Sequence, residues 1–128
     1  MIVYVTTAAL MSENKHLANP CVTDSTPTSA NQEDHVSMAA HGAFRLVRMA
    51  ENLKRIIAIE LLCAAQGVEF RAPLKTSASL RACIGVLREE IPPLKEDRFL
   101  PSDIERARDF VGVGACRRFV SGPLPELA

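Results

Sequence analysis

The chain has 128 residues, a length that fits one domain, and its fifteen basic residues balance fifteen acidic residues. This balance leaves no electrostatic footprint for a nucleic acid or an anionic membrane, so we expect neither as a partner. Apolar residues make up 48% of the sequence, which is enough for a core, but their uninterrupted runs are too short for a membrane span.

A helix is predicted over residues 2–14, where apolar side chains recur near one stripe. No N-cap residue stands ahead of its first periodic position, so we expect it to be the inner part of a longer helix. A polar segment, roughly 15–35, follows, and its Pro, Ser, Thr and Asn content excludes continuous regular structure. Loops of this length inside compact domains are usually functional or disordered.

The longest predicted helix covers roughly residues 36–66, because apolar residues recur there at spacings of three and four. These residues, which we call the apolar seam, are Val36, Ala39, Ala43, Leu46, Ala50, Leu53, Ile57, Leu61 and Ala64. The second half of the helix, 56–65, is apolar almost all round, and such a helix must be covered on every side. The rest of the chain can hardly cover it, so we expect helices from partner subunits or from missing sequence. Glu60 interrupts this run and is expected to be paired in an oligomer core or to face a polar gap. Gly67 is expected to end the helix.

Two shorter helices are predicted downstream. Ser77 caps the first, which reaches about Glu90 and is stopped by the two prolines that follow. A capping box formed by Ser102 and Glu105 begins the second, which ends near Val111. Residues 112–128 are expected to form an irregular C-terminal tail, because glycines, prolines and a basic pair dominate there. With no alternating strand pattern, the predicted fold class is all-α, with one very long helix and several shorter ones.

The cluster Asn31-Gln32-Glu33-Asp34-His35 lies where the polar segment meets the long helix, and two interpretations of it remain open. In the first, Asp34, Asn31 or Ser29 caps the helix, and acidic residues favour its positively charged first turn. In the second, Glu33 accepts a hydrogen bond or a proton from a polar group of a substrate.

Other kinds of site find no support in the spacing of the residues. His35 and His41 do not share a helical face, and the four cysteines show no ligand spacing, so no metal site is expected. Reduced thiols in a cytoplasmic protein are the simplest interpretation of these cysteines. The first residues carry no basic segment ahead of an apolar one, so no signal peptide is expected. There is no Ser-His-Asp or Cys-His motif and no glycine loop of the kind that holds phosphate.

Stretches along nearly the whole chain resemble the histidine ammonia-lyase family, with the likeness weakening after about residue 111. The most specific is the ten-residue block Ala30–Ala39. It overlaps a longer matching stretch, Thr28–Met38. The others are Ser12–Lys15, Asp24-Ser25, Ala50–Asn52, Ala58–Leu62, Ala65–Gly67, Leu74–Ser77, Asp97-Arg98 and Asp103–Glu105. The likeness is to the C-terminal quarter or so of such an enzyme, so residues 1–111 would form the C-terminal region of an ammonia-lyase-type helical bundle.

Members of this family are helical homotetramers that deaminate histidine non-oxidatively to trans-urocanate and ammonia. The resemblance therefore implies a cytoplasmic lyase of histidine degradation that takes a small amino acid substrate. It also implies assembly as a homo-oligomer or with a missing N-terminal part of the enzyme. The family's electrophile is a methylidene-imidazolone formed from an internal Ala-Ser-Gly, and this chain contains no Ala-Ser-Gly. We therefore expect no cofactor in this chain and no activity from it alone.

By position, Glu33 matches the family's catalytic carboxylate, which faces the substrate imidazole in a binding or base role, and Gln32 matches a neighbouring substrate-binding position. In relatives that act on phenylalanine or tyrosine, an amide tends to stand in the place of Glu33. A carboxylate suits an imidazole N–H donor better than a benzene ring, so histidine is the expected substrate. Two alternatives remain open: an inactive truncated chain that serves only as a helical assembly module, and a part of a phenylalanine or tyrosine ammonia-lyase.

Overall fold

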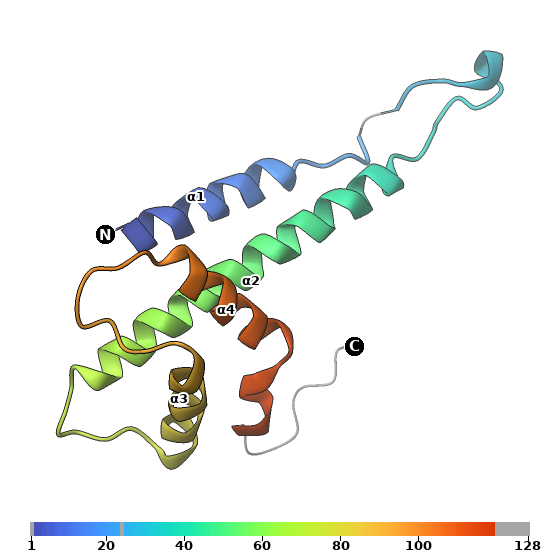
Figure 1. Cartoon of the computed structure of the whole chain (residues 1–128). Coiled ribbons are helices and arrows are strands. Elements are labelled where there is room, and N and C mark those ends of the chain that lie inside the picture. Colours follow the sequence, from blue (N-terminus) through green and yellow to red (C-terminus); the bar gives the residue numbers. More distant parts are fainter. Residues whose placement is uncertain (1, 24, 120–128) are drawn as a thin grey trace. The chain divides into compact units, whose positions relative to one another are not determined.

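The computed structural model describes residues 2–23 and 25–119, and these residues form helices and connecting loops without a β-strand (Figure 1). Their α-helices are α1 (Ile2–Leu17), α2 (Ala39–Glu69), α3 (Ala78–Glu90) and α4 (Pro101–Gly112). Two short 3₁₀ helices, η1 (Ser29–Asn31) and η2 (Ala115–Phe119), complete the described elements. The predicted all-α fold class with one very long helix is confirmed. Among the described helices, none combines the length and apolar character that crossing a membrane requires.

The chain divides into two compact units, which we call the N-terminal unit (Met1–Ile56) and the C-terminal unit (Ile57–Ala128). The boundary falls inside α2, so each unit contains part of this helix. α1, the loop after it and the first part of α2 belong to the N-terminal unit. The remainder of α2, together with α3, α4 and η2, belongs to the C-terminal unit.

Polar side chains join α1 to α2 within the N-terminal unit. The Asn52 amide donates hydrogen bonds to the Glu13 carboxylate at 2.8 Å and to Oδ1 of Asn14 at 3.0 Å. The Asn14 amide in turn donates to the Met49 carbonyl oxygen at 3.2 Å, and Arg48 forms an ion pair with Glu13. Asn52 is only 5% exposed and is the one buried residue among those described in this unit. A buried amide must find partners, and here it finds them on the neighbouring helix.

α2 begins and ends later than the sequence predicted. It starts at Ala39, whose N–H donates to the Ser37 hydroxyl at 3.3 Å, and it continues past Gly67 to Glu69. The prediction that Gly67 ends the helix was wrong, because glycine inside a helix costs only about 1 kcal/mol relative to alanine and does not forbid continuation. The helical hydrogen bonds run on through the N–H of Phe70, which donates to the Gln66 carbonyl at 3.1 Å.

Most residues of the apolar seam are exposed, although Leu61 packs against the core of the C-terminal unit. Leu46 is 63% exposed and Leu53 is 51% exposed, and the seam alanines are exposed as well. The expectation that residues 56–65 lie uncovered was correct only in part, because Ala58, Ile59 and Ala65 are buried. Glu60 is exposed in this single chain, and its pairing in an oligomer core stays a prediction.

The C-terminal unit has a small core of its own. Its central side chains are Leu87 and Ile91, both at or near full burial, together with Ala58, Ala65, Cys83, Ala107 and Phe110. Ser77 caps α3 as predicted, because its side chain accepts a hydrogen bond from the Leu80 N–H at 3.3 Å. The core therefore joins the second half of α2 to α3 and α4.

The capping box predicted for α4 is not formed. The helix begins at Pro101 with Leu100 at its N-cap position, and no side chain caps it. Proline at the first helical position has a preset backbone angle and needs no N–H partner there. Asp103, in the first turn of α4, is buried and forms an ion pair with Arg98 at 2.9 Å. This pair links the start of the helix to the preceding loop.

Part of the expected irregular tail, 112–128, has structure. η2 forms within it, and Ala115, Cys116 and Phe119 pack against the core of the C-terminal unit. These apolar side chains can bury surface there, which the glycines and prolines around them had obscured in the sequence. Residues 120–128 lie outside the described residues.

Candidate active site

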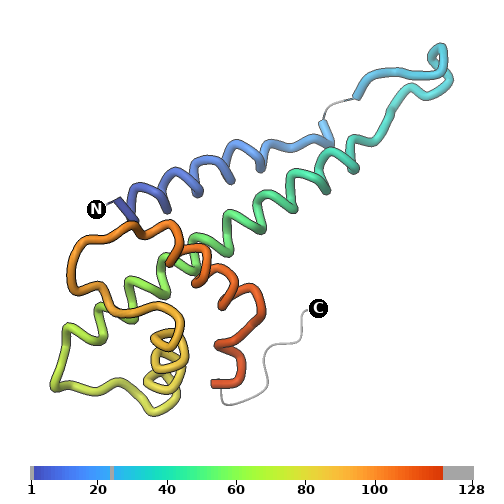
Figure 2. Tube along the Cα trace, in the orientation of Figure 1, coloured from blue at the N-terminus to red at the C-terminus, as the bar shows by residue number. Residues whose placement is uncertain are grey.

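The polar cluster found in the sequence lies on the loop between α1 and α2, which Figure 2 traces outward from α1 and back to α2. The loop closes on itself at two places. The Ser25 hydroxyl accepts a hydrogen bond from the Val36 N–H at 2.8 Å and donates to the Val36 carbonyl oxygen at 3.3 Å. Further along, Thr28 and Glu33 form an antiparallel backbone pair, with N–H to oxygen bonds of 3.0 and 3.3 Å.

A left-handed turn reverses the chain between these paired residues. Ser29, Ala30 and Asn31 have φ angles of 54°, 54° and 67°, although none of them is glycine. The left-handed region costs a residue with a Cβ roughly 1–2 kcal/mol, so three in succession need support from their surroundings. The Gln32 N–H bonds to the Ser29 carbonyl at 3.2 Å, and the two closures hold the ends of the turn. Backbone strain of this kind is concentrated at functional sites.

The side chain of Glu33 has one oxygen occupied and one available. The Thr28 hydroxyl donates a hydrogen bond to Oε2 at 2.7 Å. Within the described part of the chain, Oε1 accepts no hydrogen bond, and the residue is exposed. The carboxylate is thus held by one oxygen and can accept a hydrogen bond or a proton with the other.

The helix-capping interpretation of this cluster was wrong. α2 begins at Ala39, well after Asn31 and Asp34, so neither residue lies at its N-cap or in its first turn. The side chain that bonds the first N–H of the helix belongs to Ser37. The structure places Gln32 and Glu33 next to each other on the return limb of the loop, and their assignment as site residues stays a prediction.

The base of the loop is anchored to α2. The Arg45 guanidinium donates a hydrogen bond to the Asn19 carbonyl at 2.7 Å. The Cys21 sulfur lies 3.0 Å from the position that a Cβ on Gly42 would occupy, so a larger residue there would press on the Cys21 side chain. These contacts hold the limb that follows α1 near the start of α2.

Sequence reasoning missed Thr28 and Ser25 as partners within the site. Both precede the cluster and look like ordinary polar loop residues in the sequence. The only available signal was their place inside the stretch that resembles the family. No rule of spacing pairs a hydroxyl with a carboxylate across an irregular turn.

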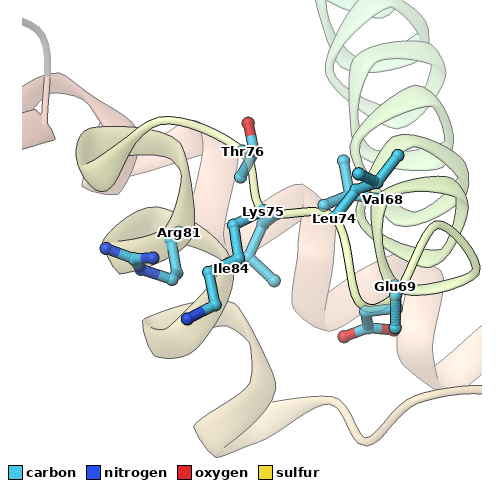
Figure 3. A pocket seen from close by; sticks show the side chains of 8 residues that line it. Val68, Glu69, Leu74, Lys75, Thr76, Arg81 and Ile84 are labelled. Carbon is cyan, nitrogen blue, oxygen red and sulfur yellow. The ribbon is translucent and has the colours of Figure 1, made fainter.

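Two other features of the C-terminal unit were considered as sites. A cavity of about 170 Å³ is lined by residues at the end of α2, the segment after it and α3 (Figure 3). Its one carboxylate, Glu69, already receives two hydrogen bonds from Arg88, at 2.7 and 2.9 Å. The cavity contains neither Gln32 nor Glu33, and the charged residues that line it besides Glu69 are the cations Lys75 and Arg81.

The second feature is a pair of thiols. The Cys83 thiol donates to the sulfur of Cys116 at 3.5 Å. Burial, together with the hydrogen bond and the charge of the neighbouring Cys83, raises the pKa of the Cys116 thiol to about 11. A nucleophilic cysteine needs a lowered pKa, so this thiol is unsuited to catalysis. Within residues 2–23 and 25–119, no three His, Cys, Asp or Glu side chains are grouped as a metal site would require.

Comparison with known proteins gives related sequences along almost the whole chain. Residues 1–89 match the family model for aromatic amino acid lyases. The chain is 62% identical to histidine ammonia-lyase from Roseobacter denitrificans over 123 residues, which is 96% of this chain and 24% of that protein. It is 61% identical to histidine ammonia-lyase from Bartonella henselae over 114 residues, or 89% of this chain and 22% of that protein. The chain thus spans about a quarter of the curated relatives that it matches.

Solved structures give the same picture. The crystal structure of histidine ammonia-lyase from Trypanosoma cruzi matches with a TM-score of 0.91 at 42% identity. This match covers 98% of this chain and 25% of that one. A tyrosine aminomutase from Streptomyces globisporus matches with a TM-score of 0.81 at 31% identity, over 89% of this chain and 22% of that one.

Proposed function

Because the chain belongs to the aromatic amino acid lyase family, we propose that it supplies Glu33 and helices to a histidine ammonia-lyase. That enzyme deaminates L-histidine non-oxidatively to trans-urocanate and ammonia. The observation that carries the proposal is a carboxylate held by one oxygen on a strained, closed loop, in a chain 62% identical to a histidine ammonia-lyase. Gln32, beside Glu33, contributes to substrate binding.

The chemistry of Glu33 suits the histidine side chain. An ionised carboxylate only accepts hydrogen bonds, and an imidazole ring offers N–H donors. A bond from that N–H to Oε1 is assisted by charge and shorter and stronger than a neutral one. Through it Glu33 holds the ring or takes its proton. A phenylalanine ring has no donor, so it would leave the carboxylate unpaired in a closed site, and this favours histidine over phenylalanine.

The electrophile of the family is supplied from elsewhere in the assembled enzyme. It forms from Ala-Ser-Gly, which this chain lacks, and when present it activates the substrate for loss of ammonia. The residues of this chain therefore bind and orient the substrate but do not provide that group. Cover for the exposed apolar seam, from other copies or from the rest of the enzyme, is part of the same proposal.

We place the function in the cytoplasm. All four cysteines, at positions 21, 63, 83 and 116, are free thiols in the structure. Free thiols are usual in reducing compartments and unusual in secreted proteins, which supports this location.

The test is a chimera in which this chain replaces the matching quarter of the Roseobacter denitrificans enzyme. In that chimera, Glu33→Gln should lower kcat/KM for histidine by about a hundredfold or more, the scale of a lost acid–base or charge-assisted contact. The melting temperature should change little, because an amide of the same shape fits the loop. Near-normal histidine kinetics in the folded variant would contradict the proposal. Glu89→Gln, the same substitution at an exposed position on α3, is the control.

A second function is favoured by the exposed seam alone: an inactive module that only assembles with other helices. The two candidates differ in whether the chimera makes urocanate, which is followed by its ultraviolet absorbance. Assembly without any turnover would select the module. Faster turnover of phenylalanine or tyrosine than of histidine would select the third candidate, a part of a lyase for those amino acids. The first two candidates, a part of a histidine ammonia-lyase and an assembly module, both predict no turnover by the chain purified alone.

A further inference from the structure

We propose that Thr28 is a positioning residue that fixes the direction of the Glu33 carboxylate, so that Oε1 meets the substrate imidazole. The inference rests on the proposed function of Glu33. Its first support is the hydrogen bond from the Thr28 hydroxyl to Oε2 of Glu33, at 2.7 Å. A short bond from a hydroxyl to a carboxylate is among the stronger side-chain hydrogen bonds.

The backbone explains why the two side chains meet. Thr28 and Glu33 exchange both of their N–H to oxygen bonds, at 3.0 and 3.3 Å. Residues paired in this way are directly opposite one another in an antiparallel pair, and their side chains project from the same face. The contact is therefore a consequence of the register of the loop. A shift of one residue would remove it.

The turn between the two residues makes that register hard to change. Three successive residues, Ser29, Ala30 and Asn31, adopt left-handed backbone angles. The clamp between Ser25 and Val36 closes the loop below them. A turn that requires this conformation admits few alternatives, so the distance between Thr28 and Glu33 is set by the backbone. The side-chain bond then fixes the remaining freedom of the carboxylate.

Fixing the carboxylate matters because a glutamate side chain is long. Without a partner, it loses rotamer freedom when the substrate orders it, and this loss weakens binding. A side chain ordered in advance places its acceptor at the productive position before the substrate arrives. Thr28 occupies only one oxygen, so it orders Glu33 without blocking it.

The experiment compares Thr28→Val and Thr28→Ser in the chimera with the Roseobacter denitrificans enzyme. Valine keeps the branched shape that suits the extended backbone of this residue but donates no hydrogen bond. Serine keeps the donor without the methyl group. We expect Thr28→Val to lower kcat/KM for histidine on the order of tenfold, and Thr28→Ser to retain most of the rate that valine loses. Thr26→Val, at an exposed position in the same loop, is the matched control.

A double-mutant cycle separates positioning from simple stabilisation of the loop. If Thr28 acts through Glu33, Thr28→Val should have no further effect on kcat/KM in a Glu33→Ala background. If Thr28 only supports the fold of the loop, Thr28→Val should lower kcat/KM by the same factor in both backgrounds. That second result would overturn the inference, and so would equal losses for valine and serine.

The outcomes also distinguish this inference from the proposed function. Normal kinetics for Thr28→Val beside a strong defect for Glu33→Gln would overturn the positioning role alone. Normal kinetics for Glu33→Gln would overturn the proposed function and this inference with it. If the long graft does not assemble, a graft of residues 24–38 alone carries the same variants in the same enzyme.

Discussion

The N-terminal and C-terminal units use the same long helix in opposite ways. In the C-terminal unit, α2 contributes Ala58 and Ala65 to a core that it shares with α3 and α4. In the N-terminal unit, Asn52 is the one buried residue among those described, and hydrogen bonds to Glu13 and Asn14 hold it. One unit is stabilised by buried apolar surface and the other by a polar cluster.

The difference does not come from a lack of apolar residues in the N-terminal unit. Phe44, Leu46, Val47 and Leu53 all lie on its part of α2, and all are exposed. Leu46 and Leu53 share one face of the helix, and Phe44 and Val47 lie on another. Exposed apolar faces are suited to burial against other helices. The candidate site belongs to the unit that has little core of its own, so its loop relies on closures made by Ser25, Thr28 and the chain around them.

The largest expected effect comes from opening the core of the C-terminal unit. Leu87 is 0% exposed, and Leu87→Ala should lower the free energy of unfolding by about 2–5 kcal/mol, since the lost side chain leaves a cavity. Urea unfolding followed by circular dichroism measures this. Leu80→Ala is the control, because Leu80 lies on the same helix but is 57% exposed, and its effect should stay within about 0.5 kcal/mol. Equal effects at the two leucines would mean that the core is not where the structure has it.

The next effect concerns the exposed seam of α2. We expect the chain to self-associate, and replacing both Leu46 and Leu53 by lysine should weaken that association at least about tenfold, given the apolar area removed. Sedimentation velocity across a range of concentrations provides the measurement. The control replaces both Phe70 and Phe99 by lysine. These two residues are exposed but lie outside the seam, so association should be unchanged. A monodisperse, monomeric wild-type chain would contradict the expectation.

A smaller effect is expected from the polar cluster of the N-terminal unit. Asn52→Ala removes the amide that joins the two helices and should cost about 1–3 kcal/mol locally, the penalty for unsatisfied partners. Hydrogen exchange of the backbone amides of α1 should speed up, while α3 is unaffected. Ser12→Ala, at an exposed position on α1, should leave the exchange unchanged. Unaltered protection of α1 in the Asn52 variant would show that something other than this cluster holds the helix.

Local patterns in the sequence were enough for most of the fold. The three- and four-residue spacing predicted α2, and Ser77 predicted the start of α3, because both rest on interactions a few residues apart. Gly67 and the capping box at Ser102 were misleading. Glycine only weakly disfavours a helix, so the helix continues past Gly67. At the start of α4, Asp103 pairs with Arg98 in the preceding loop and no capping box forms.

The candidate site could be foreseen only in outline. Glu33 and Gln32 were indicated by the resemblance, and the loop by its composition. The bond from Thr28 and the left-handed turn could not be foreseen, because they depend on how an irregular segment closes. The expectation for residues 56–65 had a correct premise, an excess of apolar surface, but Ala58, Ile59 and Ala65 in that run are buried. Burial depends on the length and path of the later helices, which periodicity does not encode.

The smallest effect is a dependence on pH confined to the C-terminal unit. Burial and the Cys83 thiol raise the pKa of Cys116 from 9.0 to about 11. Between those values the unfolded chain releases the thiol proton and the folded chain keeps it, so the folded state binds more protons and its stability falls as pH rises. Below pH 9 the Cys116 thiol is protonated in both the folded and the unfolded chain, so it does not contribute to the pH dependence of stability. Cys116→Ser removes the titrating group, so its melting temperature should fall less between pH 9 and 11, by a few degrees at most. Cys63→Ser, an exposed thiol outside the core, is the control, and identical slopes for Cys116→Ser and wild type would show that the pair of Cys83 and Cys116 does not govern this loss.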